Sequence, residues 1–257
     1  MRVAVAGGTG AVGRHVVAEL ERTGQDAVVL SRSAGVDLTT GAGLVERLKG
    51  CDAIIDVSNR VALREKAAVE FFGTVTRNLL DAGVRAGVGH LVALSIVGLD
   101  KVDTGYYKGK RKQEELVGGG PLPWTILRAT QFHEFAEPLL DGRGPFVVVP
   151  KMLCRPVATV DVAARLVELA RRPGGLVRPI AGPAEWRMEE MAKLVARARG
   201  DRKVLIPVKL PGRVGRAMTG GALLPEGPFT EAPRTFEEHL ADLEARVGSG
   251  GVSERQG

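Results

Sequence analysis

Apolar residues recur along the first half of the chain in two alternating patterns. Short runs at residues 3–6, 27–30 and 53–57 are rich in valine, isoleucine and alanine, which is typical of strands buried on both faces of a parallel sheet. The segments between these runs have apolar residues at the spacing typical of helices. The alternation predicts further strands at 90–95 and 124–128, with helices at 11–23, 42–49, 63–86 and 106–117. This order predicts an α/β fold, a doubly wound parallel sheet with helices on both faces.

The pattern is less regular after Arg128. It predicts short strands and helices at 146–149, 155–158, 162–170 (capped by Asp161), 188–199, 205–208 and, after a Thr235 cap, a final helix ending near Val247. The Gly/Pro-rich stretch 211–233 is interpreted as irregular surface or a lid over a pocket. We expect one domain over 1–247, with a core at 1–135, a mixed core and small C-terminal lobe at 136–247, and a disordered tail at 248–257.

Composition narrows the class of protein. The chain has 257 residues, 44% of them hydrophobic, which suffices for one sizeable core. Cys51 and Cys154 lie far apart and away from any histidine pair, so neither a disulfide framework nor a metal site is expected. No charged leader with a small-residue cleavage site is visible, and no apolar stretch approaches the ~20 residues of a membrane helix. We expect a cytoplasmic protein without a membrane partner.

The net charge of +6 leaves nucleic-acid binding open. The basic residues are scattered, however, and aromatic residues that could stack on bases make up only 4% of the chain. The densest basic cluster consists of Lys108, Lys110, Arg111 and Lys112. We therefore favour attraction of an anionic cofactor and do not expect a nucleic-acid partner.

A glycine-rich turn follows the first predicted strand directly. The segment reads Gly7-Gly8-Thr9-Gly10-Ala11-Val12-Gly13 and leads into a helical pattern. The first of the spaced glycines permits a tight turn, Gly10 lets the backbone approach a pyrophosphate, and Gly13 lets the helix pack closely. The helix N-terminus offers free N–H groups to phosphates. Strand, turn and helix favour a dinucleotide site over a purely structural turn, formed by Gly7, Thr9, Gly10, Ala11, Val12 and Gly13.

The end of the second predicted strand indicates which dinucleotide binds. An acidic residue there would repel a 2′-phosphate, but the chain reads Leu30-Ser31-Arg32-Ser33. Arg32 can hold a phosphate with two hydrogen bonds, and Ser31 or Ser33 can add a donor. We predict NADP(H) in preference to NAD(H), the alternative being a solvated arginine. After a third short strand, Asp37 and Leu38 are expected to line the adenine pocket, unless Asp37 only caps a helix near Gly41.

Tyr106 and Lys110 have the spacing that places two side chains on one face of a helix. Reduction of a carbonyl needs a proton donor, and a nearby ammonium would lower the pKa of a phenol. Ser95 ends the preceding strand and could hydrogen-bond the same substrate oxygen. The alternative is that Tyr106 packs at a helix start and Lys110 is solvated.

Four motifs together carry a family resemblance: the glycine-rich turn, Ser95-Ile96-Val97-Gly98, Tyr106-Tyr107-Lys108-Gly109-Lys110, and the segment from Pro123 to Phe132, PWTILRATQF. The chain resembles the short-chain dehydrogenase/reductase superfamily in its atypical NmrA-like, NAD(P)-binding branch, over about residues 1–240. The resemblance implies a Rossmann fold with a small C-terminal substrate lobe. It also implies Tyr106 as acid, Lys110 as ribose clamp and modulator of the phenol pKa, and Ser95 as orienter. Further cofactor contacts are implied for Val57, Ser58, Asn59, Thr130, Gln131 and Phe132.

His133 follows these residues and is a candidate for the substrate pocket, although a locally bonded histidine is an equal alternative. Taken together, the sequence predicts an NADPH-dependent oxidoreductase of short-chain type that transfers hydride to a small carbonyl, quinone or conjugated substrate. The alternative is a non-catalytic NmrA-like regulator that senses NADP(H). Either would be a monomer or a homodimer.

Overall fold

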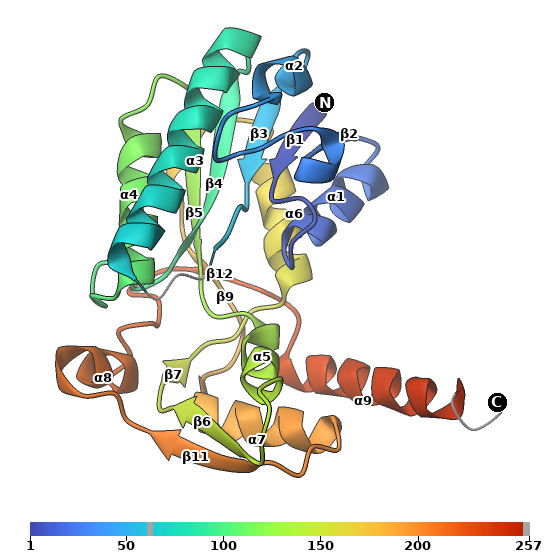
Figure 1. Ribbon diagram of the computed structural model, residues 1–257, viewed down its shortest axis with the longest axis vertical. Coiled ribbons are helices and arrows are strands. Elements are labelled where there is room, and N and C mark those ends of the chain that lie inside the picture. The colour runs from blue at the N-terminus through green and yellow to red at the C-terminus, as the bar shows by residue number, and fades with distance from the viewer. Residues whose placement is uncertain (61–63, 254–257) are drawn as a thin grey trace. The chain divides into compact units, whose positions relative to one another are not determined.

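The computed structural model describes residues 1–60 and 64–253, with side chains to Val247. The chain forms two compact units (Figure 1). The first contains Met1–Ala129 and Thr159–Pro179, and the second contains Thr130–Ala158 and the chain from Ile180 onward. The first unit thus joins the regular N-terminal half to one later segment.

A parallel sheet with strand order β2-β1-β3-β4-β5 forms the centre of the first unit. Its strands are β1 (Arg2–Ala6), β2 (Asp26–Leu30), β3 (Ala53–Asp56), β4 (His90–Ile96) and β5 (Trp124–Ala129), with the short β8 (Gly175–Leu176) paired to β5. The chain passes from β1 to β2 on one side and to β3 on the other. This reversal creates the topological switch point at which open α/β sheets bind ligands.

Helices cover both faces of this sheet (Figure 1). α1 (Gly13–Arg22) and α6 (Thr159–Leu169) pack together, while α3 (Glu65–Ala86) packs against α2 (Leu44–Leu48) and α4 (Gly105–Gly118). The strands are nearly continuous apolar runs because both faces are covered; all four residues of β3 are buried. The predicted Rossmann-type, doubly wound α/β fold is confirmed.

The second unit contains smaller elements. β6 pairs with β11 in parallel, β7 with β10 antiparallel, and β9 with β12 in parallel. Its elements are η2 (His133–Ala136), α5 (Glu137–Leu140), β6 (Phe146–Pro150), β7 (Leu153–Cys154), β9 (Ile180–Ala181), β10 (Trp186–Arg187), α7 (Met188–Ala198), β11 (Val204–Val208), α8 (Gly212–Thr219), β12 (Thr230–Glu231) and α9 (Phe236–Ser253).

The start of α9 confirms one predicted cap. The Glu238 N–H donates to Thr235 Oγ1 at 3.2 Å, and the Thr235 N–H donates to Glu238 Oε2 at 2.8 Å. This reciprocal pair is a capping box. The cap predicted at Asp161 is wrong, because α6 begins at Thr159 and places Asp161 in its first turn. A carboxylate still suits that position because it faces the positive end of the helix dipole.

Several other boundaries differ from the predicted ones. α9 continues to Ser253, so the predicted tail 248–257 overlaps the helix, and residues 254–257 lie outside those described. No proline interrupts 248–253, and glycine weakens a helix without stopping it. The stretch 211–233 contains α8. The chain between Ser31 and Asp37 forms a 3-10 helix, η1 (Arg32–Ala34), where a third short strand was predicted. Among the described residues, no helix has the length and hydrophobicity needed to span a bilayer.

Candidate functional site

Three turns leave the sheet of the first unit side by side. Ala6 at the end of β1 is in register with Leu30 of β2 and with Asp56 of β3. The residues that follow, Gly7, Ser31 and Val57, therefore start at one edge of the sheet. This edge is where parallel strands of an open α/β sheet present their ligand-binding loops.

Gly7 and Gly13 are required by contacts inside the protein. Gly7 has a φ of +82°, and a Cβ there would lie 2.8 Å from Ser58 Cα. A Cβ on Gly13 would lie 2.0 Å from the Gly7 carbonyl oxygen. Both positions exclude any side chain, so the turn closes tightly on α1 and on the segment after β3.

Gly10 is different, because it faces open space. Of the described residues other than its two chain neighbours, only Gly7, through its carbonyl oxygen at 3.2 Å, lies within 4 Å of a Cβ built on Gly10. Thr9 and Ala11 are exposed beside it, while Val12 is buried. No side chain caps α1, and its first turn contains no acidic residue. The start of α1 therefore suits an anionic group, as the sequence predicted.

The residues after β2 form the second part of this edge. Arg32 is exposed, and the hydroxyls of Ser31 and Ser33 are 2.9 Å apart. Asp37 Oδ1 accepts hydrogen bonds from the Thr39 N–H at 2.8 Å and the Thr39 hydroxyl at 2.6 Å. These bonds hold the pKa of Asp37 below its ordinary value. Asp37 thus organises its own loop.

Leu38 packs against the core cluster of the first unit. Its carbonyl oxygen accepts a hydrogen bond from Asn78 Nδ2 at 2.9 Å. Asp37 does not cap the helix that follows, because the N-cap of α2 is Gly43, and its carboxylate holds the turn at Thr39 instead. That Asp37 and Leu38 line an adenine pocket stays a prediction.

Tyr106 lies in the first turn of α4 and contacts the segment after β3. Its hydroxyl donates to Asn59 Oδ1 at 2.9 Å, and its ring packs edge-on against Phe72 at 5.8 Å. Burial raises the pKa of Tyr106 to about 12, although the hydrogen bond to Asn59 acts in the opposite direction. The predicted lowering of this pKa by Lys110 is therefore wrong, because desolvation of the phenolate dominates.

Lys110 points into the protein, one turn along α4. Its Nζ donates to the Leu94 carbonyl at 2.6 Å and to Gln113 Oε1, and it lies 4.9 Å from the centre of the Phe72 ring. Burial lowers the pKa of Lys110 to about 8, against the opposing charge of Asp56. The solvated alternative is excluded.

A buried polar network extends from Lys110 to the loop after β3. Gln113 Nε2 donates to Asp56 Oδ2 at 2.7 Å, and Asp56 Oδ1 accepts the Ser58 N–H at 2.9 Å. Gln113 and Asp56 are each 1% exposed. Sequence reasoning missed both. The signals were an aspartate that ends an otherwise apolar strand and a glutamine three residues after Lys110, on the same helix face.

The burial of Lys110 makes stability depend on pH. Between pH 8 and the ordinary lysine pKa of 10.5, the unfolded chain binds the Lys110 proton and the folded protein does not. The free energy of unfolding should therefore rise with pH across this window by about 3 kcal/mol, at ~1.4 kcal/mol per pKa unit. Denaturant unfolding of the wild type and of Lys110→Met at several pH values checks this. The contributions of the other titrating groups cancel in the difference between the two free energies of unfolding. Parallel curves for the two proteins would contradict it.

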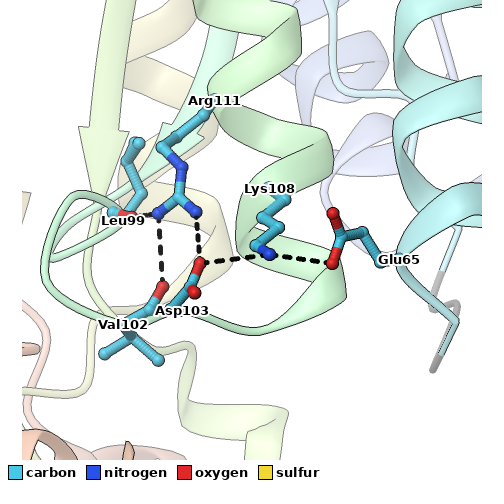
Figure 2. Close-up of polar contacts among 6 residues, drawn as sticks. All are labelled: Glu65, Leu99, Val102, Asp103, Lys108 and Arg111. Atoms are coloured by element: carbon cyan, nitrogen blue, oxygen red, sulfur yellow. Dashed lines mark hydrogen bonds and ion pairs between the residues drawn. The ribbon is translucent and has the colours of Figure 1, made fainter. Parts of the chain in front are cut away.

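The start of α4 is anchored by charged residues on both sides (Figure 2). Arg111 donates to the Leu99 carbonyl at 2.6 Å and to Asp103 Oδ1 at 2.8 Å. Lys108 bonds Glu65 Oε2 of α3 at 2.8 Å. Lys112 pairs with Glu115 at 2.7 Å. The side chains of the dense basic cluster are thus engaged within the protein: those of Lys108, Lys110 and Arg111 tie α4 to neighbouring segments, and that of Lys112 pairs within the helix.

Two serine hydroxyls at adjacent strand ends are buried without a partner. Ser58 follows β3, and Ser95 lies near the end of β4, two residues beyond the Ala93 that pairs with Asp56. Among the described residues, neither Oγ atom has a hydrogen-bond partner. Buried hydroxyls are normally satisfied. Their position therefore suits a polar ligand at this edge of the sheet.

The second unit holds the remaining predicted residues. Thr130 Oγ1 donates to the Arg155 carbonyl at 2.5 Å, and Phe132 forms an isolated parallel β-bridge with Val157. The side-chain amide of Gln131 is buried, and neither of its polar atoms has a partner among the described residues. Gln131 thus has unused hydrogen-bonding capacity, whereas the one donor of the Thr130 hydroxyl is already engaged.

His133 is almost fully buried in the second unit. Its Nε2 lies 3.2 Å from the Pro156 carbonyl, and its ring packs against Phe236 at 5.7 Å and His239 at 5.4 Å. Burial lowers the pKa of His133 to about 4. The ring is therefore neutral at pH 7 and locally bonded, which supports the structural alternative over a substrate contact.

Comparison with known families agrees with this geometry. A family model described as NAD(P)H-binding matches residues 32–173. The chain belongs to the NAD(P)H-binding family. The match extends from Arg32 beyond α6, so it is independent of the glycine-rich turn, which precedes it.

Two curated relatives of this NAD(P)H-binding protein differ in their described roles. The chain is 28% identical over 218 residues to a (4-alkanoyl-5-oxo-2,5-dihydrofuran-3-yl)methyl phosphate reductase of Streptomyces griseus, covering 77% of the chain and 74% of the relative. It is 27% identical over 227 residues to the photosystem II assembly factor Ycf39 of Synechocystis, covering 78% and 68%. One relative is thus a reductase and the other an assembly factor.

The fold is shared with a solved short-chain dehydrogenase/reductase superfamily protein from Agrobacterium tumefaciens with bound NAD. The TM-score is 0.72 at 18% identity, covering the whole of both chains. This likeness agrees with the predicted Rossmann-type fold. The family match confirms that the chain belongs to an NAD(P)H-binding family.

Proposed function

We propose that the protein is an NADPH-dependent reductase that transfers hydride to a small carbonyl, quinone or conjugated substrate. One observation carries the proposal. The segment Val57-Ser58-Asn59 packs against Gly7 of the dinucleotide turn. In the same segment, Asn59 Oδ1 accepts a hydrogen bond from the Tyr106 hydroxyl at 2.9 Å. The phosphate-binding turn and the proton donor thus meet on the same three residues.

The residues of the first unit fit a bound dinucleotide. The open Gly10 and the uncapped start of α1 suit the pyrophosphate. Ser31, Arg32 and Ser33 suit a 2′-phosphate. The unpartnered hydroxyls of Ser58 and Ser95 suit the ribose and the substrate. NADPH, when bound, supplies the hydride. The assignment of Thr130, Gln131 and Phe132 to the nicotinamide rests on the family resemblance.

Tyr106 supplies the proton to a carbonyl oxygen in this proposal. A phenol with a pKa of about 12 is protonated at neutral pH, so its hydroxyl can donate to an oxygen that gains negative charge. It would do so by exchanging its hydrogen bond to Asn59 for one to the substrate. The same pKa makes Tyr106 a poor base. The form that reduction requires, the protonated phenol, is thus the one present at neutral pH.

Lys110 has a positioning role in this scheme. Its ammonium group binds the carbonyl of Leu94, the residue before Ser95, and so fixes the strand end that presents the Ser95 hydroxyl. Through Gln113 and Asp56 it also supports the backbone of Ser58. The ribose clamp implied by the family resemblance would use the third N–H of the ammonium group, since these contacts engage two.

The second candidate is a regulator that binds NADP(H) without turnover. The assembly-factor relative and the internal contacts of Lys110 favour it. A fluorescence titration with NADPH, followed by a panel of carbonyl and quinone acceptors, separates the two. NADPH consumption that depends on Tyr106 supports the reductase, whereas binding without consumption supports the regulator. Absence of NADPH binding overturns both.

Arg32→Ala should lower the affinity for NADPH by about 10- to 100-fold and leave the affinity for NADH unchanged. A charge-assisted hydrogen bond contributes about 1.5–3 kcal/mol, and ~1.4 kcal/mol is a factor of ten. The fluorescence titration gives both dissociation constants. Arg47→Ala, an exposed arginine of α2, is the control for a loss of charge. Equal losses for both cofactors would contradict selection of the 2′-phosphate by Arg32.

A further inference from the structure

The two-stranded sheet β6–β11 of the second unit has one apolar face in solvent. Phe146 pairs with Val204, and Val148 with Ile206, so these four side chains lie on one face. Phe146 is 65% exposed, Val148 62% and Val204 53%. We call the following residues the apolar face: Phe146, Val148, Val204, Ile206, Val208 and Leu210.

The opposite face of β6 packs into the protein interior. Val147 and Val149 alternate with the exposed residues and are buried, and β6 contacts α5 and α7. A strand with one face in solvent normally carries polar residues there. Contiguous exposed apolar residues mark a protein or membrane interaction site. The apolar face therefore needs an explanation other than folding.

The segment that contains β11 and α8 is basic. The stretch from Arg202 to Pro225, which lies between Asp201 and Glu226, contains no aspartate or glutamate, and its basic residues are Arg202, Lys203, Lys209, Arg213 and Arg216. Lys203 donates to the carbonyls of Leu140 and Gly142. The other four side chains are exposed, and the part of the chain that the structure describes offers them no ion pair. The surface thus combines an apolar centre with unpaired cations.

We propose that the apolar face binds the surface of an anionic lipid bilayer. The apolar side chains would enter the headgroup boundary, and Arg202, Lys209, Arg213 and Arg216 would meet lipid phosphates. A second copy of the chain is disfavoured because a symmetric contact would bring these cations together. Such binding lies on the bilayer and needs no spanning helix. It is independent of the hydride-transfer proposal.

Vesicle flotation tests the proposal with the full chain. Vesicles of phosphatidylcholine mixed equally with phosphatidylglycerol should carry the protein, whereas pure phosphatidylcholine should not, and salt should weaken binding. Val204→Ser with Ile206→Ser, both at exposed positions, should weaken binding at least about tenfold, as should Lys209→Glu with Arg213→Glu. The matched controls, Val84→Ser with Leu176→Ser and Lys66→Glu with Arg47→Glu, alter exposed residues of the first unit.

Three results would overturn the proposal. The first is failure to bind the anionic vesicles at low salt, and the second is binding that all variants retain equally. The third is a dimer in light scattering that Val204→Ser with Ile206→Ser converts to a monomer, because the apolar face would then be covered by a second copy. NADPH titration of every variant shows whether the nucleotide site stays intact.

Discussion

Gly10→Ala is expected to leave the protein folded and to lower its affinity for NADPH about 100-fold, whereas Gly13→Ala is expected to lose both stability and binding. Apart from its two chain neighbours, a Cβ on Gly10 meets only one atom of the described residues, at 3.2 Å, and otherwise extends into open space. A Cβ on Gly13 would lie 2.0 Å from the Gly7 carbonyl oxygen. The first methyl group would therefore obstruct the ligand, and the second would force the turn apart.

Two measurements separate these effects. Thermal unfolding reports stability, and quenching of NADPH fluorescence reports affinity, where 100-fold corresponds to about 3 kcal/mol. Gly24→Ala is a useful control because Gly24 has a φ of +69° with nothing within 4 Å of a built Cβ. It should cost stability through backbone strain alone and leave binding unchanged. If Gly10→Ala binds NADPH as tightly as the wild type, the turn does not hold the pyrophosphate.

The predictable part of the fold is the part encoded locally. Strands β1 to β5 of the first unit were predicted because each is a short apolar run, and the glycine-rich turn because Gly7 and Gly13 follow β1 directly, whereas the two-residue β8 was not predicted. The sheet edge then places Ser31 and Val57 beside Gly7, since parallel strands of similar length end together. The second unit was less predictable. Several of its strands have two residues, too few to show a period.

The contacts of the candidate site depend on residues far apart in the chain. The spacing of Tyr106 and Lys110 was visible in the sequence. Asp56 was not linked to them, because it ends β3 and meets α4 through its hydrogen bond from Gln113. Spacing also says nothing of burial, and burial alone raises the pKa of Tyr106 and lowers that of Lys110. For His133 the sequence left two readings open, and its enclosure by Phe236 and His239 decided between them.

Tyr106→Phe should lower kcat for a carbonyl acceptor by about 10²- to 10⁴-fold, the range for loss of a general acid. The dissociation constant for NADPH should stay within about twofold, because the lost hydroxyl bonds Asn59 and not the turn. Loss of one hydrogen bond costs about 1 kcal/mol of stability, so the variant should fold. Single-turnover measurement of NADPH consumption reports the chemical step, and fluorescence titration reports binding.

Tyr107→Phe is the matched control, since it removes a hydroxyl from the neighbouring position of α4 and should leave kcat unchanged. Tyr106→Phe should lower kcat less for a hydride acceptor that needs no proton at oxygen than for a carbonyl. If both tyrosine variants retain full activity with carbonyls, Tyr106 is not the acid. Unchanged NADPH binding without turnover in the wild type would instead favour the regulator.

The pH dependence of kcat gives a further test of the same residue. Reduction requires the protonated phenol, and with a pKa of about 12 this form persists as the pH rises. Deprotonation of Tyr106 should therefore not lower kcat between about pH 7 and pH 10. A fall of kcat near neutral pH that disappears in Tyr106→Phe would show that a bound ligand lowers the phenol pKa. Lys110→Met then identifies the source, because that fall should shift to higher pH only if the ammonium group, freed from Leu94 and Gln113, stabilises the phenolate.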